Sequence, residues 1–323
     1  MVQLSTQTPV TVLTGYLGSG KTTLLNRILT EQHGKHYAVI VNEFGEIGID
    51  NDLIVNADEE IFEMNNGCIC CTVRGDLIRI LSGLMRRSRA FDGILIETTG
   101  LADPAPVAQT FFVDEDVRQR TKLDAIVTVV DAKHLLDEID RAHEAQEQLA
   151  FADVVLLNKT DLVSPEELAA VEARIRRINP YARIHRTERC SLPLDEILGR
   201  DAFNLERVLE FEPGFLTEEH GHEHDDAVAS LSLTAEQPMD PDRFLPWIQT
   251  ITQQFGTDIL RMKGIIAFKG DDDRFVVQGV HMLLDGGHQR AWRADEKRDS
   301  RLVFIGRDLP KDLLKSGFEA CRS

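Results

Sequence analysis

The residues with the clearest chemical meaning form a glycine-rich run near the N-terminus. This run, Gly15-Tyr16-Leu17-Gly18-Ser19-Gly20-Lys21-Thr22, matches the pattern G-x-x-x-x-G-K-[ST] in full. It follows an apolar stretch of strand length and opens an amphipathic helical pattern, which is the setting in which the pattern binds phosphate. Backbone N–H groups can turn inward around a phosphate chain there because the glycines carry no side chain. The run therefore predicts a nucleotide site.

Individual residues of this run have distinct expected roles. Lys21 is expected to reach the β- and γ-phosphates, and the Thr22 hydroxyl is expected to ligate Mg²⁺. Thr23 adds a predicted contact to the α-phosphate. The predicted nucleotide-binding residues in this part of the chain are Gly15, Gly18, Ser19, Gly20, Lys21, Thr22 and Thr23.

The base is predicted from Asn158-Lys159-Thr160-Asp161, which directly follows the apolar strand pattern at 154–157. The Asp161 carboxylate can accept hydrogen bonds from both N1–H and the exocyclic amine of guanine, whereas adenine offers no such pair of donors. A buried carboxylate left without these donors costs free energy, so the site favours guanine. We expect GTP and GDP as ligands, with a weaker backbone contribution from 187–189.

A third element is the apolar strand pattern that ends in Glu97-Thr98-Thr99-Gly100. An acid at this strand end can hold Mg²⁺ or its water, and the Gly100 N–H can sense the γ-phosphate, so the segment is expected to change shape on hydrolysis. A purely structural acid is the alternative. Lys21, Glu97 and Gly100 form the predicted catalytic group.

Three cysteines lie within four residues, in Cys68-Ile69-Cys70-Cys71. Their thiolates can supply two or three soft ligands to Zn²⁺, Co²⁺ or Cu(I) and leave a coordination position open, which suits transfer of the metal. A predicted helix at 73–87 follows, and its N-terminal dipole should lower the pKa of the thiols. Packing cysteines and a redox switch are the alternatives.

Other residues are weaker candidates for metal or structure. Glu43 is a candidate oxygen ligand of the transition metal, and Glu46 and Asp50 are candidates for the surrounding switch. His220, His222 and His224 alternate along an acidic stretch and are candidate accessory ligands, with a merely soluble linker as the alternative. Four isolated residues are expected to be structural, namely Cys190, Cys321, His281 and His288.

Composition limits the classes of partner. The 323 residues include 54 acidic and 36 basic side chains, a formal charge of −18, which disfavours nucleic acid and anionic membranes as partners. Apolar runs stay shorter than the ~18 residues of a membrane span, and no secretory signal pattern is present, so we expect no membrane association and a cytoplasmic location. The odd number of cysteines, 5, fits a reducing compartment.

Strand and helix patterns alternate through the first two thirds of the chain, which predicts a P-loop NTPase fold of the α/β class, a mostly parallel sheet with helices on both faces. The predicted strands are 10–14, 37–41, 93–96, 125–130, 154–157 and 182–186, and the predicted helices are 21–32, 73–87, 142–149 and 165–178. Residues 53–55 and 61–63 are expected to form a small hairpin.

A polar stretch separates this part from a smaller predicted α+β domain. The predicted division is a P-loop GTPase domain at 1–211, an acidic, histidine-containing linker at 212–227, and a C-terminal domain at 228–323. The second domain is expected to contain strands at 229–233, 259–268, 274–280, 282–284 and 302–306, with helices at 241–254 and 310–319.

Together these motifs, in this order, resemble the CobW family of P-loop GTPases, which are relatives of the nickel-handling UreG and HypB proteins. The resemblance rests on Gly15-Thr22, Asn42-Gly45, Asn66-Cys71, Glu97-Gly100 and Asn158-Asp161, and it covers essentially the whole chain. It implies a GTPase that acts as a metallochaperone or metal-inserting factor for Zn²⁺ or Co²⁺, with a client metalloprotein or metal-insertion machinery as partner. It also makes a nucleotide-dependent homodimer an expectation.

The resulting hypothesis couples nucleotide to metal. GTP and Mg²⁺ are expected to order 42–50 and 97–100 around the cysteines, and hydrolysis is expected to release the metal. Intrinsic turnover is expected to be slow because the motifs contain no evident arginine finger and no water-orienting glutamine. The alternatives are a metal-sensing or metal-storage GTP-binding protein and a small-molecule P-loop kinase.

Overall fold

The computed structural model describes residues 7–31, 34–42, 60–64, 72–86, 91–203, 228–293 and 296–323. The chain divides into two compact units, the first comprising residues up to 174 together with 182–204, the second 175–181 together with 205–323. The predicted boundary between 211 and 212 lies outside the described residues. The three-part division of the chain therefore stays a prediction.

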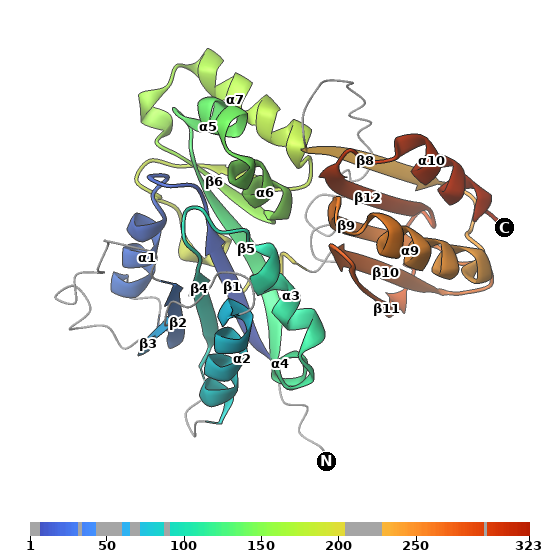
Figure 1. Cartoon of the computed structure of the whole chain (residues 1–323), viewed down its shortest axis with the longest axis horizontal. Helices are drawn as coiled ribbons and strands as arrows, with labels where there is room; N and C mark the ends of the chain where they lie inside the picture. Colours follow the sequence, from blue (N-terminus) through green and yellow to red (C-terminus); the bar gives the residue numbers. More distant parts are fainter. Residues whose placement is uncertain are drawn as a thin grey trace. The chain divides into compact units, whose positions relative to one another are not determined.

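The first unit is built on a parallel sheet (Figure 1). Its order is β3-β2-β4-β1-β5-β6-β7, and all neighbouring strands in it run parallel. The strands are β1 (Thr8–Thr14), β2 (Tyr37–Asn42), β3 (Glu60–Met64), β4 (Gly93–Glu97), β5 (Thr121–Asp131), β6 (Val154–Asn158) and β7 (Arg183–Arg186). This arrangement confirms the predicted α/β class.

Helices cover both sides of this sheet (Figure 1). They are α1 (Lys21–Thr30), α2 (Thr72–Met85), α3 (Ala105–Val113), α4 (Glu115–Arg120), α5 (Leu135–Arg141), α6 (His143–Phe151) and α7 (Pro165–Ile178), with 3₁₀ turns η2 (Thr160–Leu162) and η3 (Leu194–Glu196). Leu13 packs with Leu24 and Ile28 of α1, while the alternate residue Val12 is buried too. Both faces of the sheet are therefore covered, as a parallel sheet requires.

The structure corrects the expected hairpin. Residues 61–63 belong to β3, which pairs with β2 in parallel at the edge of the main sheet. The proposed partner strand at 53–55 lies outside the described residues. Helices α3, α4 and α5, which lie between β4 and β6 in the chain, were also absent from the predicted elements. Within the described residues, no helix is long and apolar enough to cross a membrane.

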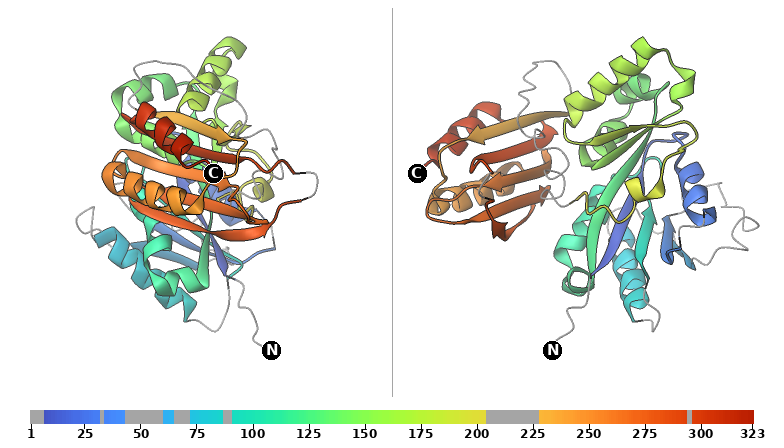
Figure 2. Two further views of the ribbon diagram at one scale, coloured as in Figure 1. Left: turned by 90° about the vertical axis from the view of Figure 1, so that its right-hand side faces the viewer. Right: turned by 180° about the vertical axis from the view of Figure 1, so that it is seen from behind.

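The second unit is an antiparallel sheet with two helices (Figure 2). Its strand order is β11-β10-β9-β12-β8. The elements are β8 (Val228–Ala235), α9 (Pro241–Phe255), β9 (Ile259–Ile266), β10 (Asp273–Val280), β11 (Leu283–Ala291), β12 (Ser300–Arg307) and α10 (Lys311–Ala320). The predicted order of strands and helices is confirmed, and the short strand expected at 282–284 is the start of β11.

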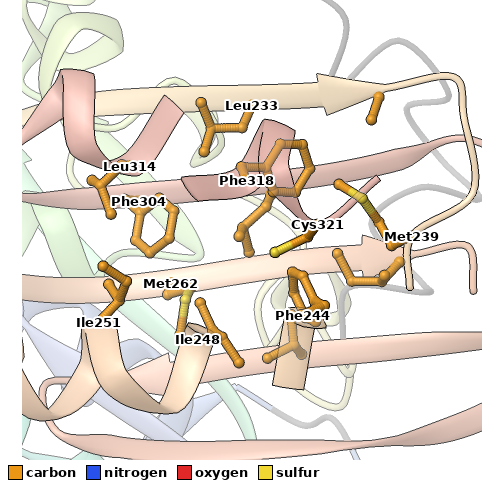
Figure 3. Packing of buried hydrophobic residues seen from close by; sticks show 14 of the residues in the cluster. Leu233, Met239, Phe244, Ile248, Ile251, Met262, Phe304, Leu314, Phe318 and Cys321 are labelled. Carbon is orange, nitrogen blue, oxygen red and sulfur yellow. The ribbon is translucent and has the colours of Figure 1, made fainter. Parts of the chain in front are cut away.

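The core of the second unit lies between this sheet and the helices α9 and α10 (Figure 3). Phe244 of α9 meets Phe318 of α10 with ring centroids 6.5 Å apart in an edge-to-face arrangement. Phe304 of β12 is fully buried beneath them. Helix α9 begins where it does because the Asp240 side chain accepts a hydrogen bond from the Asp242 N–H at 2.9 Å, with Pro241 in the first turn.

Candidate functional site

The carboxyl ends of four neighbouring strands bring the predicted motifs together. Strand β1 lies between β4 and β5, and β6 follows β5. The register pairs Leu13 of β1 with Glu97 of β4, and Asp131 of β5 with Asn158 of β6. The loop that follows β1 therefore lies between an acid from β4 and an acid from β5. This edge of a parallel sheet is where ligands bind in α/β folds.

The loop from Gly15 to Gly20 has a backbone that requires glycine. Gly15, Gly18 and Gly20 have φ angles of 142°, 76° and 116°, in the left-handed region. A Cβ on Gly15 would lie 2.2 Å from the Val129 carbonyl oxygen. One on Gly20 would lie 2.6 Å from the Asn158 side-chain nitrogen. The two glycines are thus packed against the ends of β5 and β6.

Lys21 begins α1 and turns its side chain back over this loop. Its Nζ donates hydrogen bonds to the carbonyl oxygens of Gly15, at 2.7 Å, and Tyr16, at 3.2 Å. An ammonium group has three donors, and these carbonyls take two of them. Burial lowers the pKa of Lys21, although nearby Glu97 and Glu138 act in the opposite direction. The Lys21 ammonium is therefore fixed beside the loop as a hydrogen-bond donor.

Two buried hydroxyls at the same place lack a hydrogen-bond partner among the described residues. They belong to Thr14, the last residue of β1, and to Ser19. Both side chains are 0 % exposed. Since buried polar groups are almost always paired, the two hydroxyls fit a polar ligand seated in the loop. Phosphate oxygens are acceptors of the right chemistry.

The predicted base-recognition residues lie directly against this loop. Asn158 is 2 % exposed, and its Nδ2 donates to the Ser19 carbonyl oxygen at 2.9 Å. The Nζ of Lys159 donates to the Gly18 carbonyl oxygen at 2.8 Å. Asp161 follows in the exposed turn η2. The two predicted nucleotide motifs are thus joined by direct hydrogen bonds.

Asp131 belongs to the same site, and the sequence analysis missed it. This side chain is 3 % exposed, and its Oδ2 accepts from Lys159 Nζ at 2.6 Å and from His134 Nδ1 at 2.9 Å. The Lys133 N–H donates to Oδ1 at 2.9 Å. Burial alone would raise the pKa of Asp131, but the hydrogen bonds from Lys159, His134 and Lys133 hold it below its ordinary value. The available signal was an acid at the end of a buried strand, as at Glu97.

Cys190 is also part of this framework. It is 0 % exposed, its N–H donates to Asn158 Oδ1 at 2.8 Å, and its Sγ donates to the Gly20 carbonyl oxygen at 3.4 Å. Burial raises the pKa of the thiol to about 11, so it stays protonated at neutral pH. Arg27 of α1 donates to the Cys190 carbonyl oxygen. Cys190 therefore supports both the phosphate loop and the loop that carries Asn158. It directly follows residues 187–189, which were expected to contribute backbone contacts to the base.

The segment after β4 contacts the phosphate loop and is held from α6. A Cβ on Gly100 would lie 2.6 Å from the Leu17 Cδ2 and 2.9 Å from the Leu17 backbone nitrogen. The Gln148 Nε2 donates to the carbonyl oxygens of Gly100 and Ala102, both at 3.1 Å. Burial raises the pKa of Glu97 at the start of this segment, while Lys21 acts to lower it. Gln148 was not predicted from sequence, since no motif marks it.

The predicted transition-metal ligands fall outside the described residues. These are Glu43, Cys68, Cys70, Cys71, His220, His222 and His224, and the weaker candidates Glu46 and Asp50 lie outside as well. Helix α2 begins at Thr72, directly after Cys71 in the chain. In the described part of the chain, no group of three or more His, Cys, Asp or Glu side chains could hold a metal ion.

The two isolated histidines and the last cysteine have local partners. His281 Nδ1 lies 3.2 Å from the Gly256 carbonyl oxygen, and His288 Nε2 lies 2.6 Å from Asp271 Oδ2. The Cys321 Sγ donates to the Gly317 carbonyl oxygen at 3.2 Å. These contacts fit structural roles in the second unit.

Family models match both parts of the chain. Residues 9–186 match the model described as "CobW/HypB/UreG, nucleotide-binding domain". Residues 228–322 match the model described as "Cobalamin synthesis protein cobW C-terminal domain".

Curated relatives extend over nearly the whole chain. The chain is 36% identical over 318 residues to the zinc chaperone YjiA of Escherichia coli, covering 97% of this chain and 98% of that protein. It is 44% identical over 342 residues to the zinc-regulated GTPase metalloprotein activator 1 of Schizosaccharomyces pombe, covering 93% and 82%. Among solved structures it resembles Zn(II)-bound YjiA GTPase from E. coli, with a TM-score of 0.82, 32% identity, and coverage of 98% and 99%.

Proposed function

This chain belongs to the CobW/HypB/UreG family, and we propose that it is a GTP-hydrolysing metallochaperone that binds Zn²⁺ or Co²⁺ at Cys68-Ile69-Cys70-Cys71 and delivers it to a client. The observation that carries the nucleotide half of the proposal is the direct bonding of Asn158 and Lys159 to the phosphate loop. The metal half rests on the three thiols and on relatives whose names describe zinc chaperones and a zinc-regulated GTPase.

In this proposal the phosphates lie in the loop from Gly15 to Gly20, in contact with backbone N–H groups and the Ser19 hydroxyl. The Lys21 ammonium, held by two loop carbonyls, has one donor left and reaches the β- and γ-phosphates, which share its hydrogen. Thr23 contacts the α-phosphate. Asp161 accepts hydrogen bonds from the guanine edge.

The residues present also fit a Mg²⁺ ion bound with the nucleotide. Thr22 offers a hydroxyl and Glu97 a carboxylate, and both are the hard oxygen ligands that this ion prefers. When bound, Mg²⁺ supplies neutralisation of the charge that develops on the phosphate oxygens. The Gly100 N–H lies in the segment that contacts the loop at Leu17, where it can respond to the γ-phosphate.

Hydrolysis in the proposal acts as the timer for metal release. The GTP state brings Glu43 and the three cysteines together into one metal-binding geometry, and loss of the γ-phosphate loosens it. Turnover of the protein alone is slow because the nucleotide motifs contain no evident arginine finger and no glutamine at the usual water-orienting position. A client protein is then able to supply the missing group. His220, His222 and His224 act as accessory ligands that capture metal loosely.

The proposed partner is a client metalloprotein or a metal-insertion machine, with a nucleotide-dependent homodimer as a further proposal. The formal charge of −18 makes nucleic acid an unfavourable partner. We propose a cytoplasmic location because three thiols within four residues fit a reducing compartment.

Two measurements test this function together. Multiple-turnover phosphate release with Mg²⁺ should occur with GTP, should resist competition by excess ATP, and should vanish in Lys21→Ala. Zn²⁺ and Co²⁺ titrations should show one tight site that is lost when Cys68, Cys70 and Cys71 are replaced by alanine, with Cys321→Ala as the matched control that keeps it. Phosphate release from ATP at the same rate as from GTP would contradict the proposal. A tight metal site that survives loss of the three thiols would contradict it as well.

A further inference from the structure

We infer that Asp131 is a positioning residue for guanine recognition, which holds Lys159 against the phosphate loop before any nucleotide binds. The inference rests on the proposed function, because it assigns a role within the proposed GTP site. Asp131 lies outside every nucleotide motif of the sequence. Its role follows from where β5 ends and from what its carboxylate contacts.

Lys159 has a strained backbone. Its φ angle of 61° lies in the left-handed region, which disfavours residues other than glycine. A strained residue persists only where its surroundings hold it. The Nζ of Lys159 donates to Asp131 Oδ2 at 2.6 Å and to the Gly18 carbonyl oxygen at 2.8 Å. These two acceptors fix the side chain of Lys159 between β5 and the phosphate loop.

Asp131 is itself held in a fixed position. It is the last residue of β5 and is paired in register with Asn158 of β6. The Ala132 N–H donates to the Asn158 carbonyl oxygen at 2.9 Å, which ties the two strand ends together. The Lys133 N–H and the His134 ring fix the orientation of the carboxylate. Asp131 is therefore a buried, oriented anchor, and the charge-assisted bond it accepts is of the strong kind.

The backbone turn at Lys159 links this anchor to the base. The left-handed turn at Lys159 redirects the chain from β6 into η2, which carries Asp161. When Lys159 loses its anchor, the turn can relax, and Asp161 no longer meets the guanine edge. The Nζ of Lys21 bonds the carbonyl oxygens of Gly15 and Tyr16, and neither bond involves Lys159. Loss of Asp131 should therefore weaken guanine recognition while leaving the chemical step intact.

The test is a double-mutant cycle on the full chain, with GDP and ADP affinities measured by calorimetric titration. Asp131→Asn should weaken GDP binding about tenfold, the equivalent of one charge-assisted hydrogen bond, and should lower the preference for GDP over ADP. The KM for GTP should rise while kcat stays unchanged. In a Lys159→Met background, Asp131→Asn should change GDP affinity less than about twofold, because the bond is already absent.

A matched control separates this role from general support of the fold. Asp124→Asn replaces another buried carboxylate of β5, which lies toward the opposite end of the strand from Asp131, and should lower the melting temperature without changing GDP affinity. If Asp131→Asn leaves GDP affinity unchanged, or lowers it equally with and without Lys159, the inference is wrong. If the wild-type chain binds no guanine nucleotide, the proposed function and this inference both fail. Should Asp131→Asn alone fail to fold, comparing the double variant with Lys159→Met still tests whether the effect passes through Lys159.

Discussion

The side-chain amide of Asn158 donates to the carbonyl oxygen of Ser19 across 2.9 Å, and this bond joins the base loop to the phosphate loop. The same side chain accepts from the Cys190 N–H at 2.8 Å and from the Thr187 hydroxyl at 3.3 Å. One buried amide thus connects three segments that are distant in sequence.

Replacing Asn158 should therefore affect both binding and stability. In Asn158→Ala, buried groups of Ser19 and Cys190 lose their partner, which should cost about 2–3 kcal/mol in the free energy of unfolding. GDP affinity should fall at least about tenfold. Calorimetric titration and urea denaturation measure the two effects, with Asn26→Ala on α1 as the control. Unchanged GDP affinity would contradict the role assigned to this amide.

A side chain at Gly20 should be poorly tolerated. Its φ angle of 116° is strained for other residues, and a Cβ would lie 2.6 Å from the Asn158 nitrogen. Gly20→Ala should abolish measurable GTP binding and destabilise the fold. Gly34 is the matched control, since its φ is 68° and nothing lies within 4 Å of an added Cβ. Gly34→Ala should cost only about 1 kcal/mol of strain and leave GTP binding intact. Equal behaviour of the two variants would argue against a loop packed on Asn158.

Glu138 gives the unfolding free energy a dependence on pH. Burial, with a smaller contribution from Asp131, raises the pKa of Glu138 from its ordinary 4.5 to about 7 in the folded chain. Between these values the folded state binds more protons than the unfolded state, so stability falls as pH rises. Wild type should lose more stability than Glu138→Gln between about pH 5 and 8, as read by urea denaturation at each pH. If the free energy of unfolding changes equally with pH in the two proteins, Glu138 is not the source of the pH dependence.

Asp124 supports the fold at the other end of β5. Its carboxylate accepts hydrogen bonds from the Thr11 hydroxyl at 3.1 Å, the Gly199 N–H at 2.8 Å and the Asp201 N–H at 2.5 Å. Asp124→Asn should reduce the free energy of unfolding by about 1–3 kcal/mol, because an amide cannot accept at both positions. Denaturation without nucleotide measures the loss. The Asp195→Asn control, in η3, should change the free energy of unfolding little. An Asp124→Asn variant as stable as wild type would show that these hydrogen bonds contribute nothing.

Much of the fold was predictable because its signals are local. The phosphate loop carries its own pattern, and Glu97 and Asn158 each end an apolar run of strand length. Parallel strands bring such ends to one edge of the sheet, which is why the pattern favours Glu97 and Asn158 at the same edge as the phosphate loop. In the second unit, the clear start of α9 at Asp240 and Pro241 helped in the same way.

The remainder depended on contacts between elements, which no local pattern encodes. Residues 61–63 would show the same alternation of side chains in a hairpin as in an edge strand of a parallel sheet. The structure places them in β3, which pairs in parallel with β2. Asp131 acts through the orientation of a carboxylate relative to Lys159, which register and side-chain geometry determine. Gln148 reaches Gly100 from a helix, and a buried glutamine has no sequence signature.

The most direct test of the account is the Zn²⁺ dissociation constant of the full chain, measured by competition with a chelator, with a non-hydrolysable GTP analogue or with GDP bound. We expect the Zn²⁺ affinity to be at least about tenfold tighter in the GTP state, and by linkage Zn²⁺ should raise the preference for GTP over GDP by the same factor. The difference should disappear when Cys68, Cys70 and Cys71 are alanine. Equal Zn²⁺ affinity in the two nucleotide states would contradict the claim that hydrolysis controls the metal.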